Sequence, residues 1–371
     1  MVRKNKSKSF EVSMKGIFEL MKKYGHEQIV FNYDKATGLK AVIAIHDTTL
    51  GPAIGGLRMW KYNEEQEVIE DALHLSQGMT YKYAVHGFPY GGGKAVIWGD
   101  PYTEKNDELL QAFGTFVETL KGRFVVGTDV GISSTDLVSV RKQTKYVVGL
   151  PEEFGGVGST AVITAFGVYQ GMKASAKEVF GSDSLKGKTI AVQGLGKVGK
   201  ELVHFLCQGE AKVIATDIFA ESLTFVRENY PQVDIIEPDE IYSVDCDIFS
   251  PCALGGVLND ETIPQLKCKV VCGAANNVLK EMRHAEMLKE RGILYAPDYV
   301  VNGGGLIQGL GELEGYNQDW AINKTAQIYD TLLRIYQISK EEKITTVEAA
   351  NRLVEKRLQI IQQIKSKYLG K

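Results

Sequence analysis

Three consecutive glycines, Gly91, Gly92 and Gly93, immediately precede Lys94, and a second lysine, Lys82, stands twelve residues earlier. Because glycine has no Cβ, such a stretch lets the backbone approach a ligand closely and presents the lysine from a rigid position. Burial and a neighbouring positive charge both lower the pKa of an ammonium group, so Lys94 is a candidate general base. The alternative is a glycine turn before a short strand over 95–98, with Lys94 simply solvated.

A second candidate for proton transfer is Asp129, which follows an expected strand over 123–127 and lies among glycines in Gly127-Thr128-Asp129-Val130-Gly131. Open α/β sheets carry their site residues at the carboxyl ends of the strands. Asp129 is therefore expected to face a site.

A glycine-rich run, Gly194-Leu195-Gly196-Lys197-Val198-Gly199, follows an expected strand over 188–192 and opens a helix that continues to about residue 208. The next expected strand, 211–216, ends at Asp217, which completes the dinucleotide-binding pattern. The helix amides suit a pyrophosphate, and the carboxylate suits two ribose hydroxyls but repels a 2′-phosphate, so NAD is favoured over NADP. The alternative is a glycine turn that only packs a helix on a sheet.

The composition fits these interpretations. A length of 371 residues predicts about two domains, and 44% hydrophobic with 24% charged residues is typical of a soluble globular protein. A net charge of −3 lacks the excess of basic residues that is typical of nucleic-acid-binding proteins. Five cysteines without CxxC spacing and six histidines without HExxH spacing argue against disulfides and against a metal site.

Location can also be predicted. Met1–Ser9 is basic but has no apolar stretch behind it, so it is not a secretory signal, and no run of 18 apolar residues predicts a membrane span. We expect a cytoplasmic protein without a membrane partner.

The remaining segments predict the elements that position these residues. Helices are expected over 16–24, 64–84, 106–120 and 162–179, and strands over 28–32, 39–46, 247–250, 269–272 and 292–296. The glycine-rich stretch 48–58 is predicted to be a loop, and residues 149–160 a linker. From about Asp319 the chain is expected to be helical, with a capping box at Thr345-x-x-Glu348.

Over about residues 25–357 the sequence resembles the glutamate/leucine/phenylalanine/valine dehydrogenase family. The motifs that carry the resemblance are 26–31 (HEQIVF), 45–53 (IHDTTLGPA), 78–82 (GMTYK), 91–94 (GGGK), 127–129 (GTD), 194–199 (GLGKVG), 273–277 (GAANN) and 296–299 (APDY). The resemblance implies an α/β fold with a substrate-binding and oligomerisation domain over 1–148, a Rossmann NAD-binding domain over 149–318, and C-terminal helices over 319–371 that pack back toward the first domain. It also implies a homo-oligomer that converts an L-amino acid reversibly to its 2-oxo acid and ammonia with NAD.

The resemblance also implies a role for each site residue. Lys82 would hold the substrate α-carboxylate, Lys94 would activate the attacking water, and Asp129 would assist proton transfer. Backbone from Gly55 and Gly56 and the amide of Asn276 or Asn277 would complete the site, with the division between the two asparagines left open. The residues expected to contact the dinucleotide are Gly194, Leu195, Gly196, Lys197, Val198, Gly199, Asp217, Ile218, Thr164, Cys252, Ala253 and Asn276. Cys252 could also be a nucleophile, but no histidine is close in sequence, and a structural thiol is favoured.

Four positions bear on the substrate. Family members that take glutamate carry a lysine where this chain has Ile54, and an apolar residue cannot pair a γ-carboxylate. Gly127 and Leu306 match the phenylalanine-type members, whereas Gly309 replaces a usual valine and implies a larger pocket. L-Phenylalanine is therefore favoured. Leucine or branched-chain and tryptophan dehydrogenase are the alternatives, together with a non-catalytic NAD-binding sensor.

Overall fold

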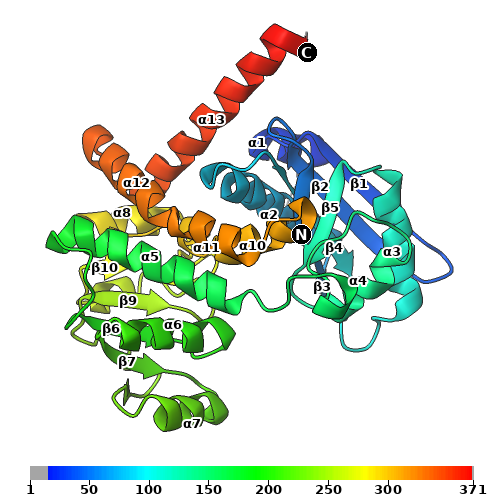
Figure 1. The fold of residues 1–371 in the computed structure, drawn as a ribbon. Helices are drawn as coiled ribbons and strands as arrows, with labels where there is room; N and C mark the ends of the chain where they lie inside the picture. The colour runs from blue at the N-terminus through cyan, green and yellow to red at the C-terminus, as the bar shows by residue number, and fades with distance from the viewer. Residues whose placement is uncertain (1–15, 370–371) are drawn as a thin grey trace, which may run out of the picture.

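The computed structural model describes residues 16–369, so the interpretation of Met1–Ser9 lies outside the described residues. Two β-sheets, each with its own helices, form two lobes (Figure 1). Residues of both lobes line a cleft. The predicted fold class, α/β with two domains and C-terminal helices, is confirmed. Within the described part of the chain, no helix is long and apolar enough to cross a membrane.

The first lobe is built on a mixed five-stranded sheet in the order β1-β2-β4-β3-β5. Its strands are β1 (Gln28–Tyr33), β2 (Lys40–Asp47), β3 (Ala53–Trp60), β4 (Gly91–Trp98) and β5 (Phe124–Thr128), and its helices are α1 (Ile17–Tyr24), α2 (Glu65–Val85), α3 (Asp107–Thr119) and α4 (Ser134–Arg141). Alternate residues of β2 pack on opposite faces: Ile43 lies in the core shared with α3, and Val42 in the core shared with α2. Helices therefore cover both faces of the sheet.

Two expectations for this lobe are wrong. The stretch expected to be a loop contains strand β3, and the three glycines expected to form a turn are the first residues of β4. The reason is packing of backbone against backbone. A Cβ on Gly55 would lie 1.7 Å from the carbonyl oxygen of Gly93, and one on Gly92 would lie 2.1 Å from the amide nitrogen of Thr80 in α2. These glycines allow close approach to other parts of the protein, whereas their residue type alone suggests close approach to a ligand.

The second lobe contains a six-stranded sheet in the order β11-β10-β9-β6-β7-β8, and every pair in it is parallel. Its strands are β6 (Thr189–Gln193), β7 (Lys212–Thr216), β8 (Asp234–Ile235), β9 (Ile248–Pro251), β10 (Val270–Val271) and β11 (Leu294–Tyr295), and its helices include α5 (Ala161–Phe180), α6 (Lys197–Gln208), α7 (Ala220–Asn229) and α8 (Arg283–Glu290), with short 3-10 turns η1 (Glu152–Phe154) and η2 (Ile263–Gln265). In chain order this is the 3-2-1-4-5-6 arrangement of a Rossmann sheet, whose ligand crevice lies at the carboxyl ends of the paired strands β6 and β9, where the strand order reverses.

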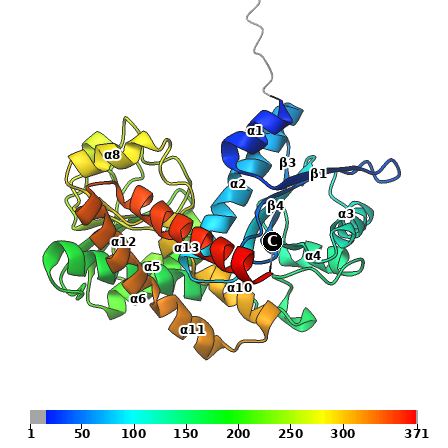
Figure 2. The ribbon, with the colours of Figure 1, turned by 90° about the horizontal axis from the view of Figure 1, so that it is seen from above.

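The last helices join the two lobes. They are α9 (Asp298–Val301), α10 (Gly304–Glu314), α11 (Gln318–Ala326), α12 (Ile328–Glu342) and α13 (Thr346–Leu369). The capping box at the start of α13 is confirmed: Thr345 Oγ1 accepts from the Glu348 amide at 3.2 Å, and the Thr345 amide donates to Glu348 Oε2 at 2.8 Å. Helix α13 then passes α2, where Arg357 donates to the carbonyl oxygen of Gly87 at 2.7 Å (Figure 2).

Candidate active site

Lys94 lies within β4 and forms an ion pair with Asp129, which directly follows β5. The Lys94 Nζ to Asp129 Oδ1 distance is 2.8 Å, and Lys94 is only 3% exposed, so the solvated interpretation is wrong. Strand β3 runs between these two strands, and Gly56 makes the approach possible. A Cβ on Gly56 would lie 2.4 Å from the Thr128 carbonyl oxygen and 2.8 Å from Asp129 Cβ.

The charges around this pair are arranged in a chain. Arg58 Nε donates to Asp129 Oδ2 at 2.7 Å, and Arg58 Nη1 donates to Asp71 Oδ2 at 2.9 Å. Burial lowers the pKa of Lys94, and Asp129 opposes that shift without cancelling it. Burial alone would raise the pKa of Asp129, but Lys94 and Arg58 outweigh it and hold that pKa below its usual value. Asp129 is therefore a fixed carboxylate, and Lys94 is the group in this pair whose proton is easier to remove than usual.

Lys82 lies in the last turn of α2 and reaches the second lobe. Its Nζ donates to Asn302 Oδ1 at 2.6 Å, and Asn302 Nδ2 donates in turn to Asn276 Oδ1 at 2.7 Å and to the Ala274 carbonyl oxygen at 3.1 Å. Burial lowers the pKa of Lys82 to about 8; Asp298 counteracts part of this shift, and Lys94 adds to it. The two lysines are thus close enough to influence each other electrostatically.

A cleft of about 960 Å³ lies between the lobes. The expected substrate residues that line it are Ile54, Gly55, Gly56, Lys82, Gly127, Asn276, Leu306 and Gly309, and the expected cofactor residues that line it are Thr164, Lys197, Val198 and Asn276. Asn277 does not line it; its carbonyl oxygen accepts from the Gly256 amide at 2.8 Å. Lys94 and Asp129 are not part of the lining, but each lies against a glycine that is: a Cβ on Gly55 would be 3.2 Å from the Lys94 amide nitrogen, and one on Gly56 would be 2.8 Å from Asp129 Cβ.

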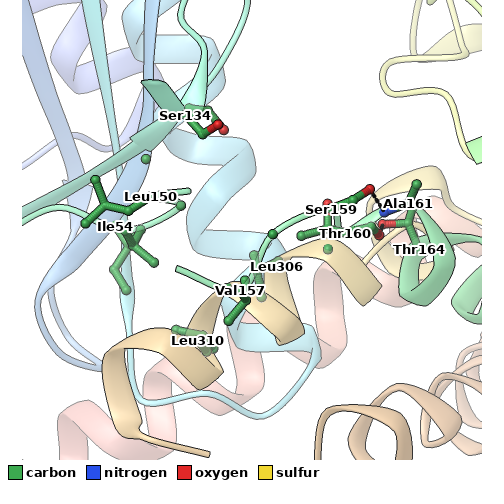
Figure 3. Close-up of a pocket in the computed structure, with 18 of the residues that line it drawn as sticks. Ile54, Ser134, Leu150, Val157, Ser159, Thr160, Ala161, Thr164, Leu306 and Leu310 are labelled. Atoms are coloured by element: carbon green, nitrogen blue, oxygen red, sulfur yellow. Dashed lines mark hydrogen bonds between the residues drawn. The ribbon is translucent and has the colours of Figure 1, made fainter. Parts of the chain in front are cut away.

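One part of the cleft is apolar and forms what we call the side-chain pocket. It comprises the lining residues that also share one hydrophobic cluster: Ile54, Met79, Tyr83, Val148, Leu306, Leu310 and Leu313. Ile54 comes from β3, and Leu306 and Leu310 come from α10 of the other lobe (Figure 3). None of the seven side chains carries a charge, so the pocket suits an apolar group.

The glycine-rich run adopts the tight turn that a dinucleotide requires. Gly194 has φ +100°, and a Cβ there would lie 2.8 Å from Ala253. A Cβ on Gly199 would lie 2.0 Å from the Gly194 carbonyl oxygen, whereas one on Gly196 would meet nothing within 4 Å. The loop is thus closed on the protein side and open beside the start of α6, where a pyrophosphate binds in this fold.

The remaining expected cofactor residues frame the same loop. Asp217 follows β7 and accepts from the Leu195 amide at 2.5 Å and from the Phe219 amide at 2.8 Å. Ile218 beside it is 77% exposed. Cys252 follows β9, its pKa is raised by burial, and its Sγ lies 3.4 Å from Ser250 Oγ. These residues fit a bound dinucleotide at the crevice between β6 and β9.

Two residues of this site were missed by sequence reasoning. Arg58 holds Asp129, and Asn302 connects Lys82 with Asn276. Arg58 stands two residues after Gly56, and alternation in a strand would have placed both on one face, had β3 been recognised as a strand. Asn302 lies 220 residues from Lys82, and no local signal joins them.

Comparison with known proteins agrees with this geometry. The family model described as Glu/Leu/Phe/Val dehydrogenase, dimerisation domain, matches residues 26–149, and the model described as Glutamate/Leucine/Phenylalanine/Valine dehydrogenase matches residues 155–362. The chain therefore belongs to the glutamate/leucine/phenylalanine/valine dehydrogenase family. Members are amino-acid dehydrogenases that use NAD or NADP, and the chain is an enzyme of this kind.

Individual relatives span nearly the whole chain. Leucine dehydrogenase of Geobacillus stearothermophilus is 50% identical over 353 residues, which cover 95% of this chain and 96% of the relative. Phenylalanine dehydrogenase of Lysinibacillus sphaericus is 50% identical over 360 residues, covering 96% and 94%. The crystal structure of L-tryptophan dehydrogenase from Nostoc punctiforme is 46% identical and aligns with a TM-score of 0.83 over 93% of this chain and 99% of that one. Dehydrogenases named for leucine, phenylalanine and tryptophan are thus similar to this chain to a comparable degree.

Proposed function

We propose that this enzyme catalyses the reversible oxidative deamination of an apolar L-amino acid, with L-phenylalanine favoured, to its 2-oxo acid and ammonia. The observation that carries the proposal is the buried Lys94–Asp129 ion pair directly behind a cleft that also contains Lys82. A cation for the α-carboxylate and a lysine with a lowered pKa are the two groups that this reaction needs most.

In this mechanism Lys82 binds the substrate carboxylate, because its ammonium group lies in the cleft beside the side-chain pocket. The bound dinucleotide supplies the hydride acceptor for the substrate Cα hydrogen. Hydride loss from the substrate with a neutral amine leaves an iminium group; water adds to its carbon, and neutral Lys94 takes the proton from that water. Transfer of a proton to the amine nitrogen then breaks the C–N bond, so that ammonia leaves and the carbonyl of the 2-oxo acid forms. Asp129 holds the Lys94 amino group at 2.8 Å and stabilises it once it is protonated. Gly55 and Gly56 line the cleft next to this ion pair.

We propose NAD as the cofactor. Asp217 stands at the end of β7, where the ribose 2′ position of a dinucleotide lies in this fold, and a carboxylate there would repel the 2′-phosphate of NADP. Gly194 to Gly199 would hold the pyrophosphate. The other parts of the dinucleotide would contact Thr164, Ile218, Cys252, Ala253 and Asn276. Asn276, and not Asn277, is the asparagine that we propose contacts the substrate and the nicotinamide, because Asn276 lines the cleft.

The preference for phenylalanine is supported by the uncharged side-chain pocket and by the space at two glycines. A Cβ on Gly127 would be 3.4 Å from Val148, and one on Gly309 would meet nothing within 4 Å. Ile54, in place of a cation, disfavours glutamate. One methyl group discriminates by only ~1–3 kcal/mol, so leucine and tryptophan are the competing substrates. A non-catalytic sensor would not need Lys82, Lys94 and Asp129 together.

We further propose that the protein is a cytoplasmic homo-oligomer. Each chain would comprise a substrate-binding and oligomerisation domain over 1–148, an NAD-binding domain over 149–318 and C-terminal helices over 319–371. The match of residues 26–149 to a model described as a dimerisation domain supports the oligomer. Five cysteines without a disulfide framework fit a reducing compartment.

The test is steady-state NADH formation with NAD and L-phenylalanine, L-leucine, L-tryptophan or L-glutamate, followed by kcat/KM for each. Phenylalanine should give the largest value and glutamate the smallest. In parallel, Lys94→Ala should lose more than about 99% of turnover, since a general base contributes roughly 10²–10⁴-fold, yet bind NADH as the wild type does. Retention of a tenth of the turnover would rule out Lys94 as the base, and silence with every apolar amino acid would favour the sensor.

A further inference from the structure

Tyr83 follows Lys82 on α2 and is part of the side-chain pocket. It is 4% exposed, and no residue of the described chain accepts from or donates to its hydroxyl group. The other six residues of the side-chain pocket are aliphatic or methionine. Its hydroxyl is therefore the only side-chain group of this pocket that can form a conventional hydrogen bond with an uncharged ligand.

The ring of Tyr83 is held from both sides of the cleft. Its centroid lies 5.9 Å from that of Tyr90 at an interplanar angle of 59°. Tyr90 in turn hydrogen-bonds Glu314, at the end of α10 in the other lobe. Burial raises the pKa of Tyr83, so the hydroxyl keeps its proton and can donate as well as accept. A fixed ring with an unpartnered hydroxyl is a preorganised polar contact in an otherwise apolar pocket.

We propose that Tyr83 is a specificity-determining residue whose hydroxyl hydrogen-bonds a polar group at the distal end of an aromatic substrate side chain, so that the enzyme takes L-tyrosine as well as L-phenylalanine. The inference rests on the proposed function and extends it to a substrate class that a purely apolar pocket would disfavour. The para-hydroxyl of tyrosine both donates and accepts, and it complements the hydroxyl of Tyr83 in either direction.

The physical reason lies in what each substrate leaves unpaired. An aliphatic or unsubstituted aromatic side chain displaces water from the pocket and leaves the Tyr83 hydroxyl without a partner, which costs free energy. A substrate hydroxyl restores the lost hydrogen bond and also satisfies itself. Discrimination therefore comes from an interaction that only para-hydroxylated substrates make.

The experiment compares wild type, Tyr83→Phe and Tyr146→Phe with three substrates: L-tyrosine, L-phenylalanine and L-4-methylphenylalanine. The methyl analogue has nearly the volume of tyrosine but cannot hydrogen-bond, so the ratio of kcat/KM for tyrosine to that for 4-methylphenylalanine isolates the hydroxyl contact. Tyr83→Phe should lower this ratio about three- to tenfold, the range expected for one neutral hydrogen bond. Tyr146→Phe removes a hydroxyl of the same hydrophobic cluster that does not line the cleft, and it should leave the ratio unchanged.

Three results would overturn the inference: an unchanged ratio in Tyr83→Phe, an equal change in Tyr146→Phe, or wild-type kcat/KM for tyrosine below a hundredth of that for phenylalanine. Thermal unfolding of both variants shows that they are folded. Failure of the inference is distinct from failure of the proposed function, because the latter would abolish NADH formation with phenylalanine itself.

Discussion

Replacing Gly92 by alanine is expected to push helix α2 away from strand β4. The new Cβ would lie 2.1 Å from the amide nitrogen of Thr80 and 2.4 Å from the carbonyl oxygen of Ser76. Both are backbone atoms of α2, so neither can rotate aside. Increasing the shorter separation to an ordinary contact of 3.4 Å requires about 1.3 Å of movement between helix and strand.

Lys82 moves with the helix, since it stands two residues after Thr80. Its contact with Asn302, at 2.6 Å, cannot persist through such a shift without rearrangement. Overpacking of this kind costs about 1–3 kcal/mol of unfolding free energy, and a misplacement of ~1 Å in a positioned group can cost on the order of 100-fold in rate. We therefore expect Gly92→Ala to lose roughly 100-fold in kcat/KM and to unfold at lower temperature.

The assay is NADH formation from L-phenylalanine together with thermal unfolding. Gly78→Ala is the matched control, because Gly78 lies on the same helix and a Cβ there meets nothing within 4 Å. This control should keep its activity and gain about 0.5–1 kcal/mol from the lower flexibility of the unfolded chain. If Gly92→Ala keeps kcat/KM within threefold of wild type and unfolds at the same temperature, the reasoning about backbone contact is wrong.

Three further predictions concern charge and volume. The lowered pKa of Lys94 predicts that kcat/KM increases with pH as this group loses its proton, and the pKa of about 8 for Lys82 predicts a decrease above this pH as the carboxylate-binding charge is lost; Lys82→Arg should shift the decrease to higher pH. Gly309→Val should lower kcat/KM for phenylalanine more than for leucine, with little effect on thermal stability, since open space surrounds the site. Burial lowers the pKa of His26 from 6.5 to about 3, so unfolding takes up a proton between these values and stability falls as pH drops through that window; thermal melts of His26→Gln should show a smaller loss over the same range.

Much of the fold follows from local patterns. Apolar periodicity predicts α2, and the order of strand, glycines, helix and acid predicts the loop at Gly194. The errors at Gly55 and Gly92 have one cause: a glycine needed for contact with another strand or helix has the same sequence signature as one in a turn. Only the partner segment distinguishes them, and that partner is distant in sequence.

The site was predictable to the extent that its residue types are chemically unusual. Lys82, Lys94 and Asp129 follow from their motifs and the family resemblance, but that Lys94 pairs with Asp129 depends on two strands flanking a third. Arg58 and Asn302 carry no such mark. The role of an arginine or an asparagine in this site depends on the residue that it binds, and for Asn302 that residue, Lys82, lies in the other lobe.

The hydrogen bonds of Asn302 have a thermodynamic consequence. This one side chain joins Lys82, from the substrate side, to Asn276, which lines the cleft beside the expected cofactor residues. Asn302 is the hydrogen-bond partner of both residues. An amino acid that binds Lys82 therefore also affects the bond between Asn302 and Asn276, and a dinucleotide that binds Asn276 also affects the bond between Asn302 and Lys82. Binding of the two ligands is then coupled, and the factor by which one changes the affinity for the other is the same in both directions.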